Sequence, residues 1–375
     1  MFLRLVLCDD AQFVMLWKDW SEHVVFDDLD HATVRMLPAL SLRLDKHGIE
    51  GELVKRIHGV YKYAWLKNEQ LLNVVYSVAK MCADNNIEVA FLKGVPLLLS
   101  VYKNTAMRIL SDADMLVHSD DVLRLFTLLQ SEGWVHRDPS MVSVTQFGLD
   151  KVIHATVMIH PSGAKLEIHW NVYHVDTFEY TLQLLMFNKD IPMQKRDFWK
   201  HALPLSVRDI PCNMLSYEDL FVHVIVHGAE GSVRRPVRWV VDAVSVMRTI
   251  DLDWERVYEI VTELGYEYHM QVALRYLREV YDVVFPDDFI KKLYSKKSSD
   301  KVIKRYYQVG EIHFPLLGNF PLLWYRYWLY ESEGSVVHKM LQFPAYLKIA
   351  WKIPKQKSVF AFMFDKYAKR ISRSL

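Results

Sequence analysis

Apolar residues recur at helical spacing through the first part of the chain, which predicts helices over residues 30–85. The pattern is clearest over residues 68–81. It then changes to the short apolar run Ile87–Gly94, which predicts a strand that ends in glycine. The next segment, Val95–Tyr102, predicts a helix, because Pro96 suits a first helical turn, where its missing N–H is not needed.

Two carboxylates stand one residue apart inside the apolar run Ile109–Val117, which predicts another strand. Because strand side chains alternate between faces, Asp112 and Asp114 are expected on the same side. Neighbouring carboxylates repel and raise each other's pKa, and a divalent cation such as Mg²⁺ or Mn²⁺ relieves the repulsion. The residues alone leave a second interpretation open, an edge strand with one face in water.

A β-hairpin is predicted further along the chain, with arms at residues 154–160 and 164–170 around a Pro-Ser-Gly turn. In the second arm Lys165, Glu167 and His169 fall on one face of the strand. A carboxylate there is a candidate ligand or an ordinary solvated side chain. His169 is a candidate contact to substrate or metal, or a hydrogen-bond partner that orients its neighbour.

A series of residues in fixed order gives the chain a more specific signature. The series is Leu92-Lys93-Gly94, Tyr102, Arg108, Ser111–Val117, Gly133-Trp134, Leu166–Trp170, Leu220, His223, His227, Arg238-Trp239 and Asp242. It resembles the uncharacterised nucleotidyltransferases, a branch of the DNA polymerase β-type nucleotidyltransferase superfamily, over roughly residues 35–290. The resemblance implies an α+β fold: a polymerase β-like core of mixed sheet and helices, flanked by N-terminal and C-terminal helical regions.

The same resemblance implies metal-dependent transfer of a nucleotidyl group from an NTP to an unidentified acceptor, by a two-metal mechanism. Asp112 and Asp114 would hold both ions, Mg²⁺ or Mn²⁺. Glu167 would be the third acidic ligand, because the superfamily takes it from a later strand beside the D-x-D strand. It would complete the ion that activates the acceptor hydroxyl, and it is a candidate base for the hydroxyl proton.

The nucleotide phosphates are expected near the turn after the first strand. There Lys93 and the backbone N–H groups that follow Gly94 would hold the β- and γ-phosphates. Arg108 would meet a phosphate or pair with Asp112. The family pattern has a Ser or Gly where this chain has Val95, and the spacer between Gly94 and Asp112 is longer than usual.

A second group of polar residues lies in the helical region that begins near Ser216. His223 and His227 are four residues apart, a spacing that suits a metal pair or two side chains packed between helices. Three arginines are candidate phosphate contacts, because guanidinium forks match phosphate oxygens, and an exposed basic face is the alternative. They are Arg234, Arg235 and Arg238.

The pattern divides the chain into four parts. Residues 1–85 are an N-terminal helical region and 86–212 the nucleotidyltransferase core. Residues 213–300 are expected to form a helical domain that closes the cleft, and 301–375 an aromatic and basic helical extension. From 348 to 375 there are eight Lys or Arg and one acidic residue, which suits a membrane surface, an acidic partner or a solvated tail.

Composition narrows the class of protein. The 375 residues are 51% hydrophobic and 24% charged, as in soluble globular proteins, and the net charge of +1 argues against a general nucleic-acid binder. The three cysteines have no paired spacing, which favours a reducing compartment. No apolar run reaches the roughly 18 residues of a membrane span, and Asp9-Asp10 interrupts the apolar start. We therefore expect a cytoplasmic protein.

The acceptor cannot be named from these residues, and a sugar, a small metabolite, a protein side chain and an RNA end all remain open. Two other functions fit the same pattern. One is a toxin-like transferase that acts on tRNA or protein. The other is a catalytically silent nucleotidyltransferase fold that serves as a binding or scaffold subunit, which Val95 favours and the three acidic residues oppose.

Overall fold

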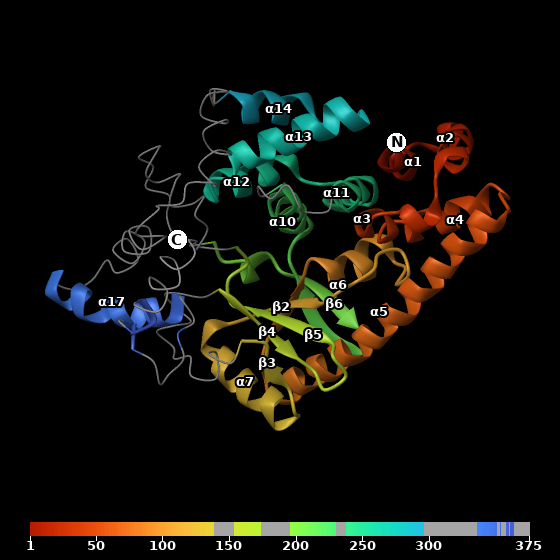
Figure 1. Cartoon of the computed structure of the whole chain (residues 1–375). Helices are drawn as coiled ribbons and strands as arrows, with labels where there is room; N and C mark the ends of the chain where they lie inside the picture. The colour runs from red at the N-terminus through yellow and green to blue at the C-terminus, as the bar shows by residue number, and fades with distance from the viewer. Residues whose placement is uncertain are drawn as a thin grey trace, which may run out of the picture. The chain divides into compact units, whose positions relative to one another are not determined.

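The protein combines helices with a mixed sheet, which confirms the α+β class (Figure 1). The structure, a computed structural model, describes residues 1–138, 154–173, 196–229, 238–295 and 336–350, with 353, 358, 359 and 361–363. The chain separates into two compact units, and the boundary between them passes through strands β2 and β5. The first unit comprises Met1–Leu116, Ser162–Leu166 and Gln194–Ser298, and the second Val117–Pro161, Glu167–Met193 and Ser299–Leu375.

The N-terminal part is helical, as the periodicity predicts. Its elements are α1 (Phe2–Leu7), α2 (Asp10–His23), η1 (Phe26–Asp28), α3 (His31–Val34), α4 (Pro38–Lys46) and α5 (Glu52–Asp84). The carboxylates of Asp9 and Asp30 cap α2 and α3 by accepting backbone N–H groups of the first turn. Helix α5 is 33 residues long and contains the whole predicted segment 68–81. It packs against α4 and against strands β6 and β7.

Seven strands form one sheet in the order β3-β4-β5-β2-β1-β7-β6. They are β1 (Val89–Leu92), β2 (Ala113–Val117), β3 (Val135–His136), β4 (Ala155–Ile159), β5 (Lys165–His169), β6 (Leu203–Val207) and β7 (Ile210–Met214). Strands β1 and β7 are parallel, whereas β3 with β4 and β6 with β7 are antiparallel. Every residue of β1 and β2 is buried, which explains their nearly continuous apolar sequences. The predicted strands before Gly94, around Asp114 and in both hairpin arms are confirmed.

The segment after β1 is helical, as predicted, but it is not a regular α-helix. A single turn, α6 (Gly94–Pro96), runs into a π-helix, η2 (Leu97–Tyr102). A π-helical stretch is widened relative to an α-helix and is frequent at functional sites. Lys103, with φ 50°, follows the last turn in the left-handed conformation. Helix α7 (Val122–Ser131) follows the 3₁₀ turn η3 (Ser119–Asp121) after β2.

A helical group follows the sheet: α10 (Tyr217–Ala229), α11 (Arg238–Thr249), α12 (Trp254–Glu263), α13 (Glu267–Tyr281) and α14 (Asp287–Tyr294). Helix α10 packs against α11, α12 and α13 (Figure 1). The Ser216 hydroxyl accepts the backbone N–H of Asp219 over 3.1 Å and so caps the start of α10, where the sequence predicts a helical region to begin. A further helix, α17 (Val336–Ala350), lies in the second unit. Within the described stretches, no helix has both the length and the apolar character needed to cross a membrane.

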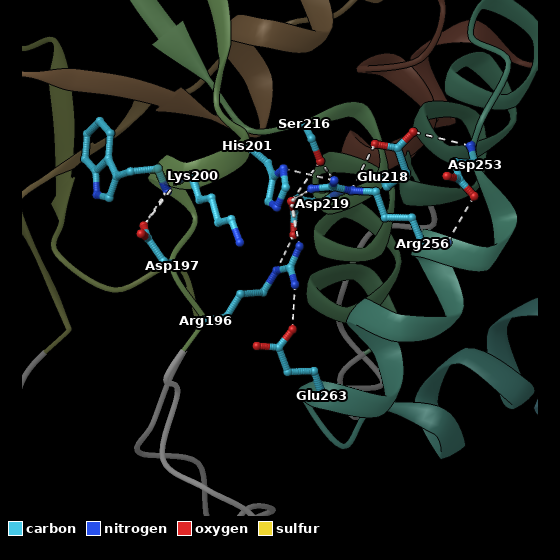
Figure 2. A network of polar contacts seen from close by, with 11 residues as sticks. Arg196, Asp197, Lys200, His201, Ser216, Glu218, Asp219, Asp253, Arg256 and Glu263 are labelled. Carbon is cyan, nitrogen blue, oxygen red and sulfur yellow. Dashed lines mark hydrogen bonds and ion pairs between the residues drawn. The ribbon is translucent and has the colours of Figure 1, made fainter.

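A polar network fastens the chain at the start of α10 (Figure 2). Arg196 donates from Nε and Nη2 to the two carboxylate oxygens of Asp219, over 2.8 and 3.2 Å, and from Nη1 to Glu263 on α12 over 2.5 Å. Asp219 is fully buried. Arg256 of α12 lies 3.6 Å from the same carboxylate and 3.7 Å from Glu218. The buried carboxylate of Asp219 on α10 thus links the segment before β6 to helix α12.

Replacing Arg196 with Met should lower the free energy of unfolding by about 3 kcal/mol, because Asp219 would stay buried without its bidentate partner. Urea denaturation followed by circular dichroism measures this loss. Lys80→Met is the control, because Lys80 pairs with Asp84 in an exposed position on α5 and its removal should leave unfolding unchanged. Equal effects of the two substitutions would show that the network does not hold α10 to α12.

Candidate functional site

Lys93 occupies the turn between β1 and α6. Its backbone has φ 50° and ψ −105°, a region that residues other than glycine rarely adopt and that persists where the surroundings fix it. From this turn its Nζ donates to Oδ1 of Asp114 over 2.5 Å. The two side chains are only 17% and 7% exposed. The end of the first strand therefore delivers an ammonium group to the second carboxylate of the D-x-D motif.

Three side chains that can ligate a metal ion lie together on neighbouring strands. They are Asp114 on β2 and Glu167 and His169 on β5, and one ligand atom from each lies within 4.8 Å of the others. His169 is buried, and its Nε2 lies 3.5 Å from Oε2 of Glu167. Within the part of the chain that the structure describes, no other group of three such side chains comes together. The strand alternation that placed Glu167 and His169 on one face is consistent with this arrangement.

Asp112 is the remaining acidic candidate, and it lies immediately before β2 rather than within it. It is half-buried, and its Oδ1 accepts a hydrogen bond from the Ser111 hydroxyl over 2.9 Å. It does not belong to the group formed by Asp114, Glu167 and His169. Its part in metal binding stays a prediction.

Side chains from the segment before β2 approach Gly94 closely. A Cβ at this position would lie 2.5 Å from Cδ2 of Leu110 and 2.7 Å from Nη1 of Arg108. Such distances exclude any side chain at position 94 without a shift of its neighbours. The structure thus places a guanidinium group beside the glycine where the sequence predicts a phosphate.

The segment between η2 and β2 is held by Asn68, a fully buried residue of α5. Its side-chain amide donates to the carbonyls of Thr105 and Arg108, the latter over 2.8 Å. Its Oδ1 accepts the backbone N–H of Leu110 over 2.9 Å. Sequence patterns give no signal for this role, because the segment it holds is about forty residues away in the chain.

A buried carboxylate on α11 collects the polar side chains that precede β2. Asp242 accepts hydrogen bonds from Nε of Arg108, over 3.1 and 3.2 Å, and from the hydroxyl of Tyr102 over 2.8 Å. Burial raises the pKa of Tyr102 well above its ordinary value, so the phenol stays a donor. Sequence reasoning offered a phosphate or Asp112 as the partner of Arg108. The structure shows the carboxylate of Asp242 in that position.

Two further arginines converge on the backbone of the same segment. Arg238, at the start of α11, donates from Nη1 to the Ile109 carbonyl over 3.0 Å. Arg35, which follows α3, donates from Nη2 to the same oxygen over 3.2 Å. Arg35 was not a candidate from the sequence, because no motif marks it. Arg238 was a candidate phosphate contact, and its side chain, only 18% exposed, does not fit the alternative of an exposed basic face.

The other predicted residues of the helical region are less well placed for chemistry. His223 is buried, and its ring lies 6.0 Å from that of His227, centroid to centroid, in an edge arrangement. Neither histidine joins a group of three metal-ligating side chains among the described residues. Arg234 and Arg235 lie outside the described residues.

A mixed sheet with acidic side chains on neighbouring strands is consistent with a nucleotidyltransferase, and comparison with protein families agrees. The family described as "Uncharacterised nucleotidyltransferase" matches residues 32–282. This is more than half of the 375 residues, so the chain belongs to that family.

Comparisons with individual proteins add less. A solved structure described as an antigenic nucleotidyltransferase-like protein from Paracoccidioides brasiliensis is similar at 16% identity, with a TM-score of 0.36. The match covers 63% of this chain and 97% of that one. No curated protein sequence matches.

Asn68→Ala should destabilise the protein by about 2–5 kcal/mol, because two carbonyls and one N–H would lose their partner in the interior. Asn73→Ala is the matched control, since Asn73 is exposed on the same helix. Chemical denaturation of both variants measures the difference. Similar stability of the two variants would mean that Asn68 does not anchor the segment before β2.

Proposed function

We propose that the protein is a metal-dependent nucleotidyltransferase that moves a nucleotidyl group from an NTP to an acceptor hydroxyl. The observation that carries the proposal is the convergence of Asp114, Glu167 and His169 within 4.8 Å. Membership of the nucleotidyltransferase family supports the reaction class. The identity of the acceptor is left open by both.

The donor set fits a divalent cation. Carboxylate oxygens are the ligands that Mg²⁺ and Mn²⁺ prefer, and an imidazole nitrogen beside them is a further donor or a partner that orients Glu167. Asp114 and Glu167 would hold the cation, with Asp112 as the additional carboxylate. When bound, the cation would neutralise phosphate charge and polarise the reacting phosphate.

The chain's own groups account for the remaining requirements of the reaction. Lys93 offsets the negative charge that collects on Asp114 and Glu167, which lets the two carboxylates lie close together. Glu167 is half-buried, and its carboxylate is the group proposed to accept the hydroxyl proton, directly or through a water molecule. Nε2 of His169 lies 3.5 Å from Oε2 of Glu167 and keeps the Glu167 carboxylate in position.

The proposed reaction is an in-line displacement. The acceptor oxygen forms a bond to the α-phosphorus of the NTP while the bond from that phosphorus to the bridging β-phosphate oxygen breaks. The hydroxyl proton passes to Glu167, and pyrophosphate leaves with the electron pair of the broken bond.

A catalytically silent fold is the second candidate, and two contacts favour it. Nζ of Lys93 donates to a carboxylate oxygen of Asp114, and a guanidinium nitrogen of Arg108 lies in the space beside Gly94. A silent protein would keep the fold and nucleotide contacts but would transfer nothing. The test below separates the two candidates.

Asp114→Asn and Glu167→Gln should each lower nucleotidyl transfer by at least roughly 10²-fold, because each removes charge at the reacting phosphate. The assay uses each labelled NTP with Mg²⁺ or Mn²⁺ and a metabolite, protein and RNA extract as acceptor. Mn²⁺ binding, followed by electron paramagnetic resonance, should weaken in the same variants.

Asp120→Asn is the control, because Asp120 is exposed just after β2 and outside the cluster. It should retain both the activity and the Mn²⁺ affinity of the wild type. Undiminished transfer in Asp114→Asn and Glu167→Gln would contradict the proposed mechanism. Absence of transfer by the wild type with every NTP would favour the silent fold.

A further inference from the structure

Three guanidinium groups gather around one buried carboxylate, and together these four side chains form the arginine cluster: Arg35, Arg108, Arg238 and Asp242. Asp242 bonds Arg108 directly and lies 3.9 Å from Nε of Arg238. Arg35 and Arg238 share the Ile109 carbonyl. All four residues belong to the first of the two compact units.

The arginine cluster has an excess of positive charge. Three guanidinium groups lie near one aspartate, Asp242. Asp112 also attracts Arg35, but the two carboxylates together balance only two of the three positive charges. The side chains of Arg108 and Asp242 are 9% and 5% exposed, so solvent screens the repulsion poorly. Burial and the neighbouring Arg108 and Arg35 lower the pKa of Arg238 to about 9. A bound anion would relieve this repulsion.

The arginine cluster also has hydrogen-bond donors to spare. Arg108 bonds Asp242 through Nε, and its Nη1 and Nη2 make no hydrogen bond within the described ranges of the chain. Nε of Arg35 is buried and has no partner in the same ranges. A buried donor such as Nε of Arg35 is unfavourable unless a ligand or water satisfies it. The number and planar geometry of these donors suit the oxygens of a phosphate group.

Its place in the fold connects the arginine cluster to the metal-ligating side chains. Nη1 of Arg108 approaches the position of a Cβ on Gly94 to 2.7 Å. The residue before Gly94 is Lys93, which bonds Asp114. Arg35 also donates toward the Ser111 hydroxyl, which in turn bonds Asp112. An anion on these guanidinium groups would therefore lie next to the D-x-D motif.

We propose that the arginine cluster binds the diphosphate part of the NTP and the pyrophosphate that leaves, and that Arg35 is a binding residue for it. This inference rests on the proposed nucleotidyl transfer for its ligand. When the bond to the β-phosphate oxygen breaks, negative charge develops on that oxygen, and the guanidinium groups stabilise it. The excess charge of the arginine cluster means that pyrophosphate binds without any divalent cation.

Isothermal titration of the full chain with inorganic pyrophosphate, in EDTA, tests the inference. The wild type should bind pyrophosphate, and Arg35→Gln should weaken the affinity about 10- to 100-fold, through the loss of charge-assisted hydrogen bonds. Arg248→Gln is the control, because Arg248 lies at the other end of α11 and bonds the Leu7 carbonyl. It should bind pyrophosphate as the wild type does.

Arg35→Lys keeps the charge and loses the fork, so it should fold and bind several-fold more weakly than the wild type. If Arg35→Gln does not fold, the pyrophosphate affinity of Arg35→Lys tests the inference in its place. A non-hydrolysable NTP should compete with pyrophosphate, since both would occupy the arginine cluster. Absence of pyrophosphate binding, wild-type affinity in the Arg35 variants, or simultaneous binding of both ligands would overturn the inference.

The titration requires neither metal, acceptor nor turnover. Pyrophosphate binding through Arg35 in a protein that transfers nothing would therefore uphold the inference and count against the proposed function. Transfer activity without pyrophosphate binding would uphold the proposed function and overturn the inference.

Discussion

The carboxylate of Asp242 lies buried on α11 and accepts hydrogen bonds from Tyr102 and from Arg108. Tyr102 ends the π-helix η2, and Arg108 belongs to the segment that leads into β2. One carboxylate therefore ties both ends of this connection to the helical region. Without its charge, three guanidinium groups would lie close together in a poorly solvated place, which is strongly unfavourable.

Asn68, on helix α5, holds the same connection by bonding two of its carbonyls and one of its N–H groups. Both residues hold the segment just before Asp112 and Asp114, Asp242 through side chains and Asn68 through backbone atoms. Together with the strained turn at Lys93, they fix where the acidic strand begins and which groups stand beside it. The chemistry proposed for the carboxylates depends on this frame, because the carboxylates themselves repel each other.

Much of the fold follows from local pattern. Helical periodicity predicted the N-terminal helices, and the buried apolar runs predicted β1 and β2, because these features depend on neighbours in sequence. The resemblance and the alternation of its strand made Glu167 a candidate ligand, and its side chain lies beside that of Asp114. Asp112, expected on the same strand face, lies one residue before β2 begins, and its place in the site stays a prediction.

The residues that sequence reasoning missed share a physical character. Arg35 and Asn68 act on backbone atoms far away in the chain, and no periodicity or motif reports such contacts. Arg108 found its partner on α11, a helix more than a hundred residues later. Tertiary packing decides these pairs, so only the folded structure reveals them. Three members of the arginine cluster, Arg108, Arg238 and Asp242, were noted in the sequence, but neither Arg35 nor the meeting of the four side chains could be predicted from it.

The central claim is that a divalent cation and an NTP meet at Asp114 and Glu167. A crystal structure of the protein with Mn²⁺ and a non-hydrolysable NTP, examined by anomalous scattering at the manganese edge, tests it directly. The account predicts an anomalous peak within about 2.4 Å of a carboxylate oxygen of each residue, with the α-phosphate beside the ion. A nucleotide bound elsewhere in the protein, with no peak between Asp114 and Glu167, would contradict it.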